Sequence, residues 1–199
     1  MTYEFKDETS LCEYLEKRYN GVYLRSSTLP LPFCADKPRV KAIVLGTDPS
    51  NPRRIPVQQV FDLGNAESPF FRPILNNLHQ IGLALEEVYV QNLCKNYFRQ
   101  ATSANANWVR IAGLWRGLIK QELDGLFDRR IPVLITAWPL YLALALNPII
   151  EKPSDLYRMQ VAVKPAENYL GRTIIPFFRH WFYNLEKWDA YREWVKGLI

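Results

Sequence analysis

Three polar residues with side chains suited to chemistry each follow an apolar run typical of a buried strand. Asp48 follows AIVL and Gly46-Thr47, Asn92 ends the run VYVQN, and His180 follows TIIPFFR. A carboxylate can orient an attacking water, an imidazole can donate a hydrogen bond, and an amide offers both a donor and an acceptor. Ligands of open α/β sheets bind outside the carboxyl ends of the strands, so we expect the three side chains to meet at one rim.

Each of these residues also has a plain structural interpretation. An Asp-Pro pair after a strand, as at Asp48, commonly forms a turn or caps a helix, and an Asn such as Asn92 at a strand end is usually a turn residue. His180 is one of only two histidines, and taken alone it is better explained as structural. The catalytic interpretation therefore depends on the three residues reaching the same edge.

The elements that must position these residues follow from hydrophobic periodicity and from helix stop signals. Helix and strand patterns alternate, which predicts an α/β fold: a three-layer αβα sandwich with a central, mainly parallel four-stranded sheet. We expect one domain, residues 1–199. The expected helices are 7–20, 70–82, 105–127, 138–146 and a last one from 181, and the expected strands are 41–46, 86–92, 131–137 and 172–178.

Three segments carry more specific expectations. Ser10 and Glu13 have the spacing of a capping box at the start of the first helix. The uncharged run 131–150 is about as long as a membrane span, but Pro132, Pro139 and Pro148 interrupt it, so it is better explained as a buried strand followed by a buried helix. One face of the last helix is expected to be buried: Trp181, Leu185, Trp188, Tyr191, Val195 and Leu198.

Composition narrows the class of protein. With 199 residues, 48% hydrophobic and 23% charged, the chain is typical of a soluble globular domain. Its net charge of +5 is compatible with a polyanionic partner. The scattered Cys12, Cys34 and Cys94 disfavour a disulfide framework, a zinc site or an iron–sulfur cluster, and the charged N-terminus has no secretion signal. We therefore expect a cytoplasmic protein.

The ordered motifs resemble those of the uracil-DNA glycosylase superfamily over roughly residues 40–185. GTDPSNP resembles the G-x-D-P motif that opens the active site, VYVQNL the strand whose terminal Asn reads uracil, and TIIPFFRH the late strand that supplies a histidine. Phe61 in VFDLGN stands where the family places an aromatic that stacks on the flipped base. PFFRPILNNLHQIGL is similar to the family's next helix.

This resemblance implies a DNA repair glycosylase that hydrolyses the N-glycosidic bond of a flipped-out uracil or related base, without metal or cofactor. It implies DNA as the partner and a monomeric protein. Arg99 also lies near the expected rim. The implied catalytic residues are Asp48 and His180, the base-binding residues Asn92, Phe61, Gly46 and Thr47, and the contacts to DNA phosphate Arg53, Arg54, Lys95 and Arg179.

The chain departs from the family pattern at two places. Ser50-Asn51 follow the first motif where the family has an aromatic and often a His, and Trp181-Phe182 follow His180 where the family has Pro-Ser. These departures motivate an alternative, a non-catalytic protein that binds nucleic acid or nucleobases on the same fold. An unrelated α/β enzyme of phosphorylated metabolites ranks lowest, because no Gly-rich phosphate loop follows the first strand.

Overall fold

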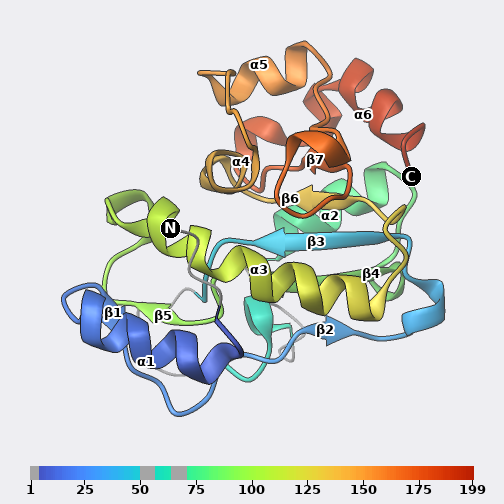
Figure 1. Ribbon diagram of the computed structural model, residues 1–199. Coiled ribbons are helices and arrows are strands. Elements are labelled where there is room, and N and C mark those ends of the chain that lie inside the picture. The colour runs from blue at the N-terminus through green and yellow to red at the C-terminus, as the bar shows by residue number, and fades with distance from the viewer. Residues whose placement is uncertain (1–4, 50–56, 64–70) are drawn as a thin grey trace.

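The computed structural model describes residues 5–49, 57–63 and 71–199. Its main feature is a five-stranded sheet with the strand order β2-β4-β3-β6-β7 (Figure 1). β3, β4, β6 and β7 are parallel, and β2 pairs with β4 in the antiparallel sense. The strands are β2 (Phe33–Cys34), β3 (Ala42–Gly46), β4 (Val88–Asn92), β6 (Val133–Ile135) and β7 (Ile174–Pro176).

The two central strands are apolar because they are covered on both faces. Every residue of β3 and β4 is buried, which is the burial expected of parallel strands between helices. The register places Val44 beside Val90 on one side and beside Leu134 on the other. In this register Gly46 lies opposite Asn92, so two of the expected site residues are neighbours at the ends of their strands.

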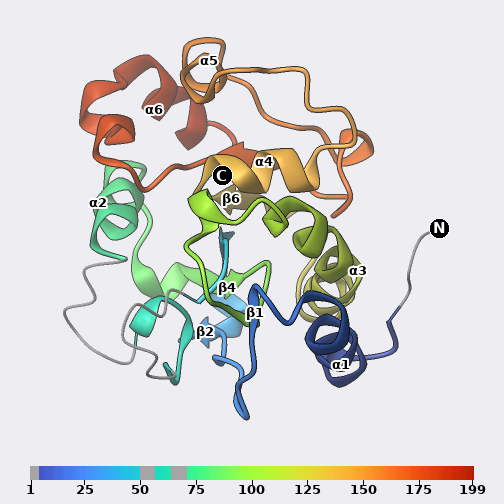
Figure 2. The ribbon, with the colours of Figure 1, turned by 90° about the vertical axis from the view of Figure 1, so that its left-hand side faces the viewer.

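Helices pack on both faces of this sheet. Figure 2 shows α1, α3 and α4 on one side of the sheet and α2 and α6 on the other. In α3, Ile111, Trp115, Ile119 and Leu123 are spaced by four residues and are fully buried, which explains why this segment is an amphipathic helix. The helices are α1 (Glu8–Tyr19), α2 (Arg72–Gln80), α3 (Trp108–Leu126), α4 (Trp138–Leu144), α5 (Pro153–Arg158) and α6 (Asp189–Lys196).

The predicted α/β class and the four parallel strands are confirmed, but the sheet has a fifth strand. β2 lies in the proline-containing segment 22–38, which is outside the expected helices and strands. It has only two residues, so it has no alternation from which it can be recognised. A separate two-stranded sheet of β1 (Tyr23–Leu24) and β5 (Tyr97–Phe98) was missed for the same reason.

The first helix begins differently from the expectation. Asp7 is the N-cap of α1, and its Oδ1 accepts a hydrogen bond of 2.8 Å from the backbone N–H of Ser10. The Ser10 hydroxyl lies 3.4 Å from the backbone N of Asp7 and completes the capping box. Ser10 is therefore the third residue of the helix and not its N-cap. The predicted capping box of Ser10 with Glu13 is wrong, because the observed box of Asp7 with Ser10 lies three residues earlier.

The expected last helix is also wrong in part. Residues from 181 form two short 3-10 turns, η6 (Trp181–Tyr183) and η7 (Leu185–Lys187), before α6 begins at Asp189. Leu185, Tyr191 and Val195 are buried as expected, but Trp181 is 68% exposed and Leu198 is 40% exposed. The turns form because the side chains of His180 and Asn184 accept hydrogen bonds from backbone N–H groups two residues on.

The uncharged run 131–150 folds as expected, with β6 followed by α4. Within residues 5–49, 57–63 and 71–199, no helix has both the length and the apolar character that a bilayer crossing requires.

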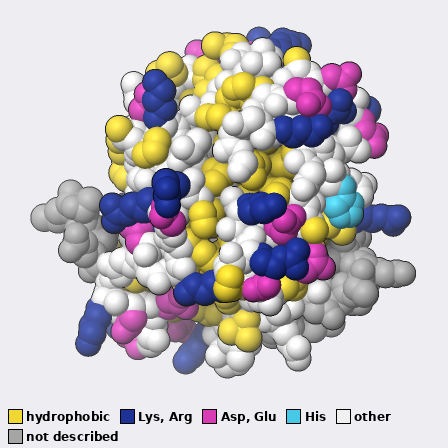
Figure 3. All heavy atoms as spheres, turned by 90° about the vertical axis from the view of Figure 1, so that its right-hand side faces the viewer, with side chains coloured by type: hydrophobic (Ala, Val, Ile, Leu, Met, Phe, Trp, Pro, Cys, Tyr) yellow, Lys and Arg dark blue, Asp and Glu magenta, His cyan; other side chains and the backbone are white. Residues whose placement is uncertain are grey.

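The amino ends of the parallel strands form the edge of the sheet opposite the expected site. Figure 3 views this side of the molecule and shows basic and acidic side chains interspersed on it. Lys41 pairs with Glu87 and Arg130 pairs with Asp128. This pairing gives the edge little attraction for a polyanion, so a site for one is better sought at the carboxyl edge.

Candidate active site

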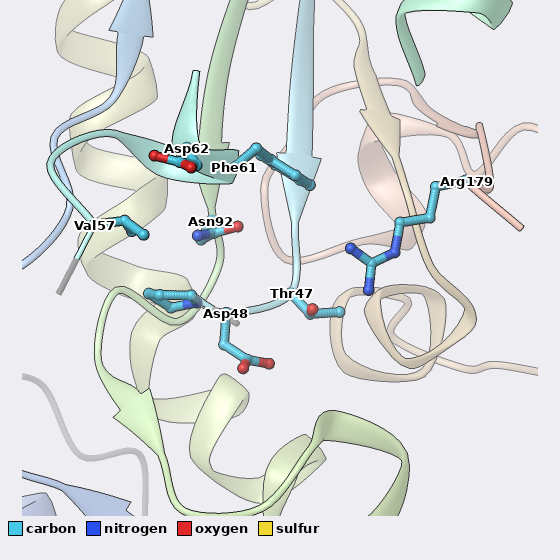
Figure 4. A pocket seen from close by; sticks show the side chains of 8 residues that line it. Thr47, Asp48, Val57, Phe61, Asp62, Asn92 and Arg179 are labelled. Atoms are coloured by element: carbon cyan, nitrogen blue, oxygen red, sulfur yellow. The ribbon is translucent and has the colours of Figure 1, made fainter. Parts of the chain in front are cut away.

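A pocket lies at the carboxyl edge of the sheet, where Asp48 and Asn92 follow neighbouring strands (Figure 4). It has about 440 Å³ of empty volume, including the part open to solvent. Its wall combines two carboxylates, an amide, a guanidinium and an aromatic ring. The lining residues are Thr47, Asp48, Pro49, Val57, Phe61, Asp62, Asn92 and Arg179.

Asp48 is held in place by two donors from outside the sheet. Its Oδ1 accepts a hydrogen bond of 2.5 Å from the Thr102 hydroxyl and one of 2.7 Å from the indole N–H of Trp108. Thr102 begins the 3-10 turn η4 (Thr102–Ala104), and Trp108 is the first residue of α3. Both bonds end on Oδ1, and the Thr47 hydroxyl is a third, weaker partner of the carboxylate.

Burial changes the acidity of this carboxyl. Loss of solvation raises the pKa of Asp48 from 3.8 to about 6, although the hydrogen bonds from Thr102 and Trp108 and the positive charge of Arg179 partly offset the rise. The carboxyl is therefore still ionised at neutral pH, and it is a stronger base than an exposed aspartate. A carboxylate in this state is suited to polarise a water molecule.

Asn92 places an amide in the pocket that has no partner among the described residues. The residue is 2% exposed, and its side chain forms no hydrogen bond with any residue in the described part of the chain. Figure 4 shows its nitrogen turned toward Val57 and its oxygen turned the other way. Because Asn92 lines the pocket and its amide is not bonded to a described residue, both the donor and the acceptor of the amide are open to a polar ligand.

Gly46 allows Asn92 and Phe61 to lie close to the end of β3. A Cβ at Gly46 would lie 2.3 Å from Oδ1 of Asn92 and 2.4 Å from Cζ of Phe61. Any side chain at this position would therefore displace one of the two groups. The Phe61 ring also packs edge-on against Phe71, with ring centroids 5.5 Å apart.

Arg179 enters from the far side of the sheet. The backbone N–H of Arg179 donates to the carbonyl of Thr136, which extends the pairing of β6 and β7 beyond the strand ends. The guanidinium then faces Thr47 across the pocket in Figure 4. The pocket brings together five of the residues that were expected at this rim. They are Thr47, which follows Gly46, and Asp48, Phe61, Asn92 and Arg179.

His180 lies outside this group. It is exposed, and it lines neither of the two hollows at this edge. Its Nδ1 accepts a hydrogen bond of 3.3 Å from the backbone N–H of Phe182, and its ring lies beside that of Trp181. The structure therefore does not bring the histidine together with Asp48 and Asn92.

Lys95 does not lie at the rim as a free cation. Its ammonium group pairs with the carboxylates of Glu8 and Glu122, and its side chain is 9% exposed. Tyr89 and Gln91 donate hydrogen bonds to the same Glu122 carboxylate. This cluster joins α1 and α3 to β4, so Lys95 has a structural position where a phosphate contact was expected.

A second, larger hollow adjoins the pocket on the far side of Asp48. It has about 920 Å³ of empty volume, and Thr47, Asp48, Pro49 and Arg179 line both spaces. Arg99, which is exposed, also lines it. The predicted phosphate contacts Arg53 and Arg54 lie outside the described residues.

Sequence reasoning missed the residues that hold Asp48. Trp108 lies within the expected helix 105–127, and the sequence pattern gives neither Trp108 nor Thr102 a role at the site. One signal was available, because the indole N–H of a buried Trp needs an acceptor and an acid at a nearby strand end can supply it. For Thr102 and Asp62 no such signal exists, since both lie in 3-10 turns of three residues, which are too short to show a hydrophobic period.

Comparisons with known proteins do not place the chain in a family. No protein-family model matches the sequence, and no curated protein matches it. The candidate function therefore rests on the geometry of this pocket and on the motifs that compose it.

Proposed function

We propose that this protein is an N-glycosidic hydrolase that removes uracil, or a related base, from DNA. The observation that carries the proposal is one pocket holding a carboxylate whose pKa is raised by burial and an amide without a partner among the described residues. Hydrolysis of this bond requires a group that stabilises a cationic sugar and a group that recognises the base. Asp48 and Asn92 supply these two groups.

The proposed reaction begins with a flipped-out nucleotide, whose base enters the pocket. The Asp48 carboxylate orients a water toward C1′ of the sugar and stabilises the developing oxocarbenium charge. The C1′–N1 bond breaks as the water oxygen attacks, and its electron pair leaves with the base. Asp48 accepts the proton of the water, which gives an abasic sugar and a base anion.

The departing base carries negative charge, so a cation near it lowers the barrier. The sequence assigned this role to a hydrogen bond from His180. Arg179 is better placed for it, since its guanidinium lines the same pocket as Asp48. Phe61 provides an aromatic ring on the wall of the base pocket, and Thr47 also lines it.

DNA binding would use the carboxyl edge of the sheet. Arg99 and Arg179 both line the larger hollow that continues from the pocket, and both are exposed. Their charges can neutralise phosphates on either side of a flipped nucleotide. Arg53 and Arg54 stay as predicted phosphate contacts, whereas Lys95 is left out of this proposal because two carboxylates neutralise it.

A direct assay tests the proposal. Oligonucleotides with one uracil, opposite G, opposite A or single-stranded, are incubated with the protein and then scored for alkali-labile abasic sites. We expect cleavage by the wild type and a loss of about 10²- to 10⁴-fold in Asp48→Ala. Arg179→Ala should be impaired more than His180→Ala, and the reverse ranking would return the catalytic role to the histidine.

The exposed position of His180 favours one alternative, a protein that binds nucleic acid or nucleobases without cleaving them. The same assay separates the two. Specific binding of uracil-containing DNA with no abasic product in any context would support the alternative and reject the hydrolase.

A further inference from the structure

A second carboxylate, that of Asp62, lines the base pocket and has no role in the proposed chemistry. Asp62 ends the 3-10 turn η2 (Val60–Asp62) and is half-buried. Within the described part of the chain, its side chain forms no hydrogen bond and no ion pair. A carboxylate in this position is an acceptor that a ligand can reach.

The local backbone places this side chain at the pocket at some cost. Phe61 and Asp62 both have left-handed backbone angles, with φ of 56° and 57°. Each such residue costs roughly 1–2 kcal/mol for an L-amino acid. The turn is held by a 3.1 Å hydrogen bond from the backbone N–H of Asp62 to the carbonyl of Gln59. Strain of this kind is found at ligand sites, and here it brings two neighbouring side chains to one pocket.

Asn92 presents mainly its donor to the same pocket. Oδ1 of Asn92 lies so close to Gly46 that a Cβ added to this glycine would be 2.3 Å from it. The Phe61 ring lies against the same glycine. The nitrogen is turned toward the side where Val57 lies (Figure 4). The pocket therefore offers an N–H donor from Asn92 and an acceptor from Asp62, which is an alternating pattern.

We propose that Asp62 accepts the N3–H of the bound base while the Asn92 amide donates to a neighbouring carbonyl oxygen. The inference rests on the proposed function and names its substrate class: bases with an imide edge, in which N–H stands beside C=O. Cytosine has a bare acceptor nitrogen at that position, so it would place two acceptors against each other. Selection against it would come from this mismatch.

The charge of Asp62 also predicts whether removing this side chain affects substrate binding or the rate of bond cleavage. A carboxylate beside the base opposes the negative charge that develops as the base departs. Asp62 should therefore improve selection and ground-state binding without increasing the rate of bond cleavage. Removing it should raise KM about tenfold or more and leave kcat unchanged or higher.

The test uses oligonucleotides that carry either uracil or 3-methyluracil, in which a methyl group replaces the N3 hydrogen. The wild type should cleave 3-methyluracil at least about 100-fold less efficiently than uracil, because the donor is lost and the methyl group meets the carboxylate. Asp62→Ala should lose efficiency on uracil and gain it on 3-methyluracil. Asp62→Asn retains an acceptor and should restore the discrimination, and Asp36→Ala, a loop acid outside both hollows, is the control.

The outcomes separate this inference from the proposed function. Equal discrimination in wild type and Asp62→Ala, with uracil cleavage unchanged, would overturn the role of Asp62 while leaving the hydrolase intact. If the wild type cleaves no uracil at all, the hydrolase fails, and calorimetric binding of free uracil and 3-methyluracil then tests Asp62 alone. A preference for uracil that Asp62→Ala abolishes would support the assignment, and absent or equal binding would reject it.

Discussion

Replacing Asp48 by Asn should stabilise the protein at neutral pH while removing its activity. In the folded state the pKa of Asp48 is raised from 3.8 to about 6 because the carboxyl is buried. Each pKa unit corresponds to about 1.4 kcal/mol, so keeping this carboxyl ionised in the folded protein costs about 3 kcal/mol above pH 6. Asn carries no charge to desolvate, and its side-chain oxygen can still accept the hydrogen bonds from Thr102 and Trp108.

The direction of the pKa shift determines how the stability difference between wild type and Asp48→Asn depends on pH. Between pH 3.8 and 6 the folded state holds a proton that the unfolded chain has lost, so wild-type stability falls as the pH rises through this window. Below pH 3.8 wild type and Asp48→Asn should be about equally stable. Above pH 6.5 the variant should be more stable by up to about 3 kcal/mol, and the difference should then stay constant.

Urea denaturation of both proteins at pH 4, 5, 6 and 7.5 measures this difference, provided that the slope of the transition is unchanged. Abasic-site formation from a uracil oligonucleotide is measured on the same samples. A variant that is less stable than the wild type by an amount independent of pH would refute the assigned pKa of Asp48. A stabilised variant that retains full activity would refute its role as the group that orients the water.

Three further perturbations have defined outcomes. Arg179→Ala removes a charge that lowers the pKa of Asp48, so the acid limb of the pH–rate profile should move to higher pH, whereas Arg179→Lys should leave it in place. Gly46→Ala puts a Cβ 2.3 Å from the Asn92 amide oxygen, so it should lower the free energy of unfolding by about 1–3 kcal/mol and raise KM. Gly117→Ala is the control, because its Cβ would have nothing within 4 Å, and urea titrations should show little change in its stability. Lys95→Met leaves the partly buried carboxylates of Glu8 and Glu122 without their cation and should lower the free energy of unfolding by about 3–5 kcal/mol. The salt dependence of DNA binding, measured by fluorescence anisotropy, should stay unchanged.

Much of the scaffold could be predicted from local sequence because its signals are periodic. The run AIVL and the run VYVQN are short, apolar and rich in β-branched residues, and they form β3 and β4. The spacing of Ile111, Trp115 and Ile119 specified α3 within a few residues of its observed ends. Such patterns are visible because each element must bury one face or both faces.

The C-terminal segment shows where periodicity fails. Trp181, Leu185 and Trp188 have helical spacing, but two side chains that bond to the backbone favour 3-10 turns over a continuous helix. The result leaves Trp181 exposed and directs His180 away from the pocket. Arg179, one residue earlier, enters the pocket, because the pairing of β6 and β7 continues as far as its backbone N–H.

Local residue patterns predict the class of fold and place Asp48 and Asn92 at the carboxyl ends of parallel strands, which meet at one edge of a sheet. The structure shows that the two strands are adjacent, and the residues around Asp48 and Asn92 depend on tertiary packing. Thr102 and Trp108 are 54 and 60 residues from Asp48 along the chain, and their hydrogen bonds partly offset the rise in its pKa that burial causes. Asp62 reaches the pocket through a left-handed turn that no periodic pattern encodes. Contacts between distant segments depend on how whole elements pack, and local residue patterns do not specify that packing.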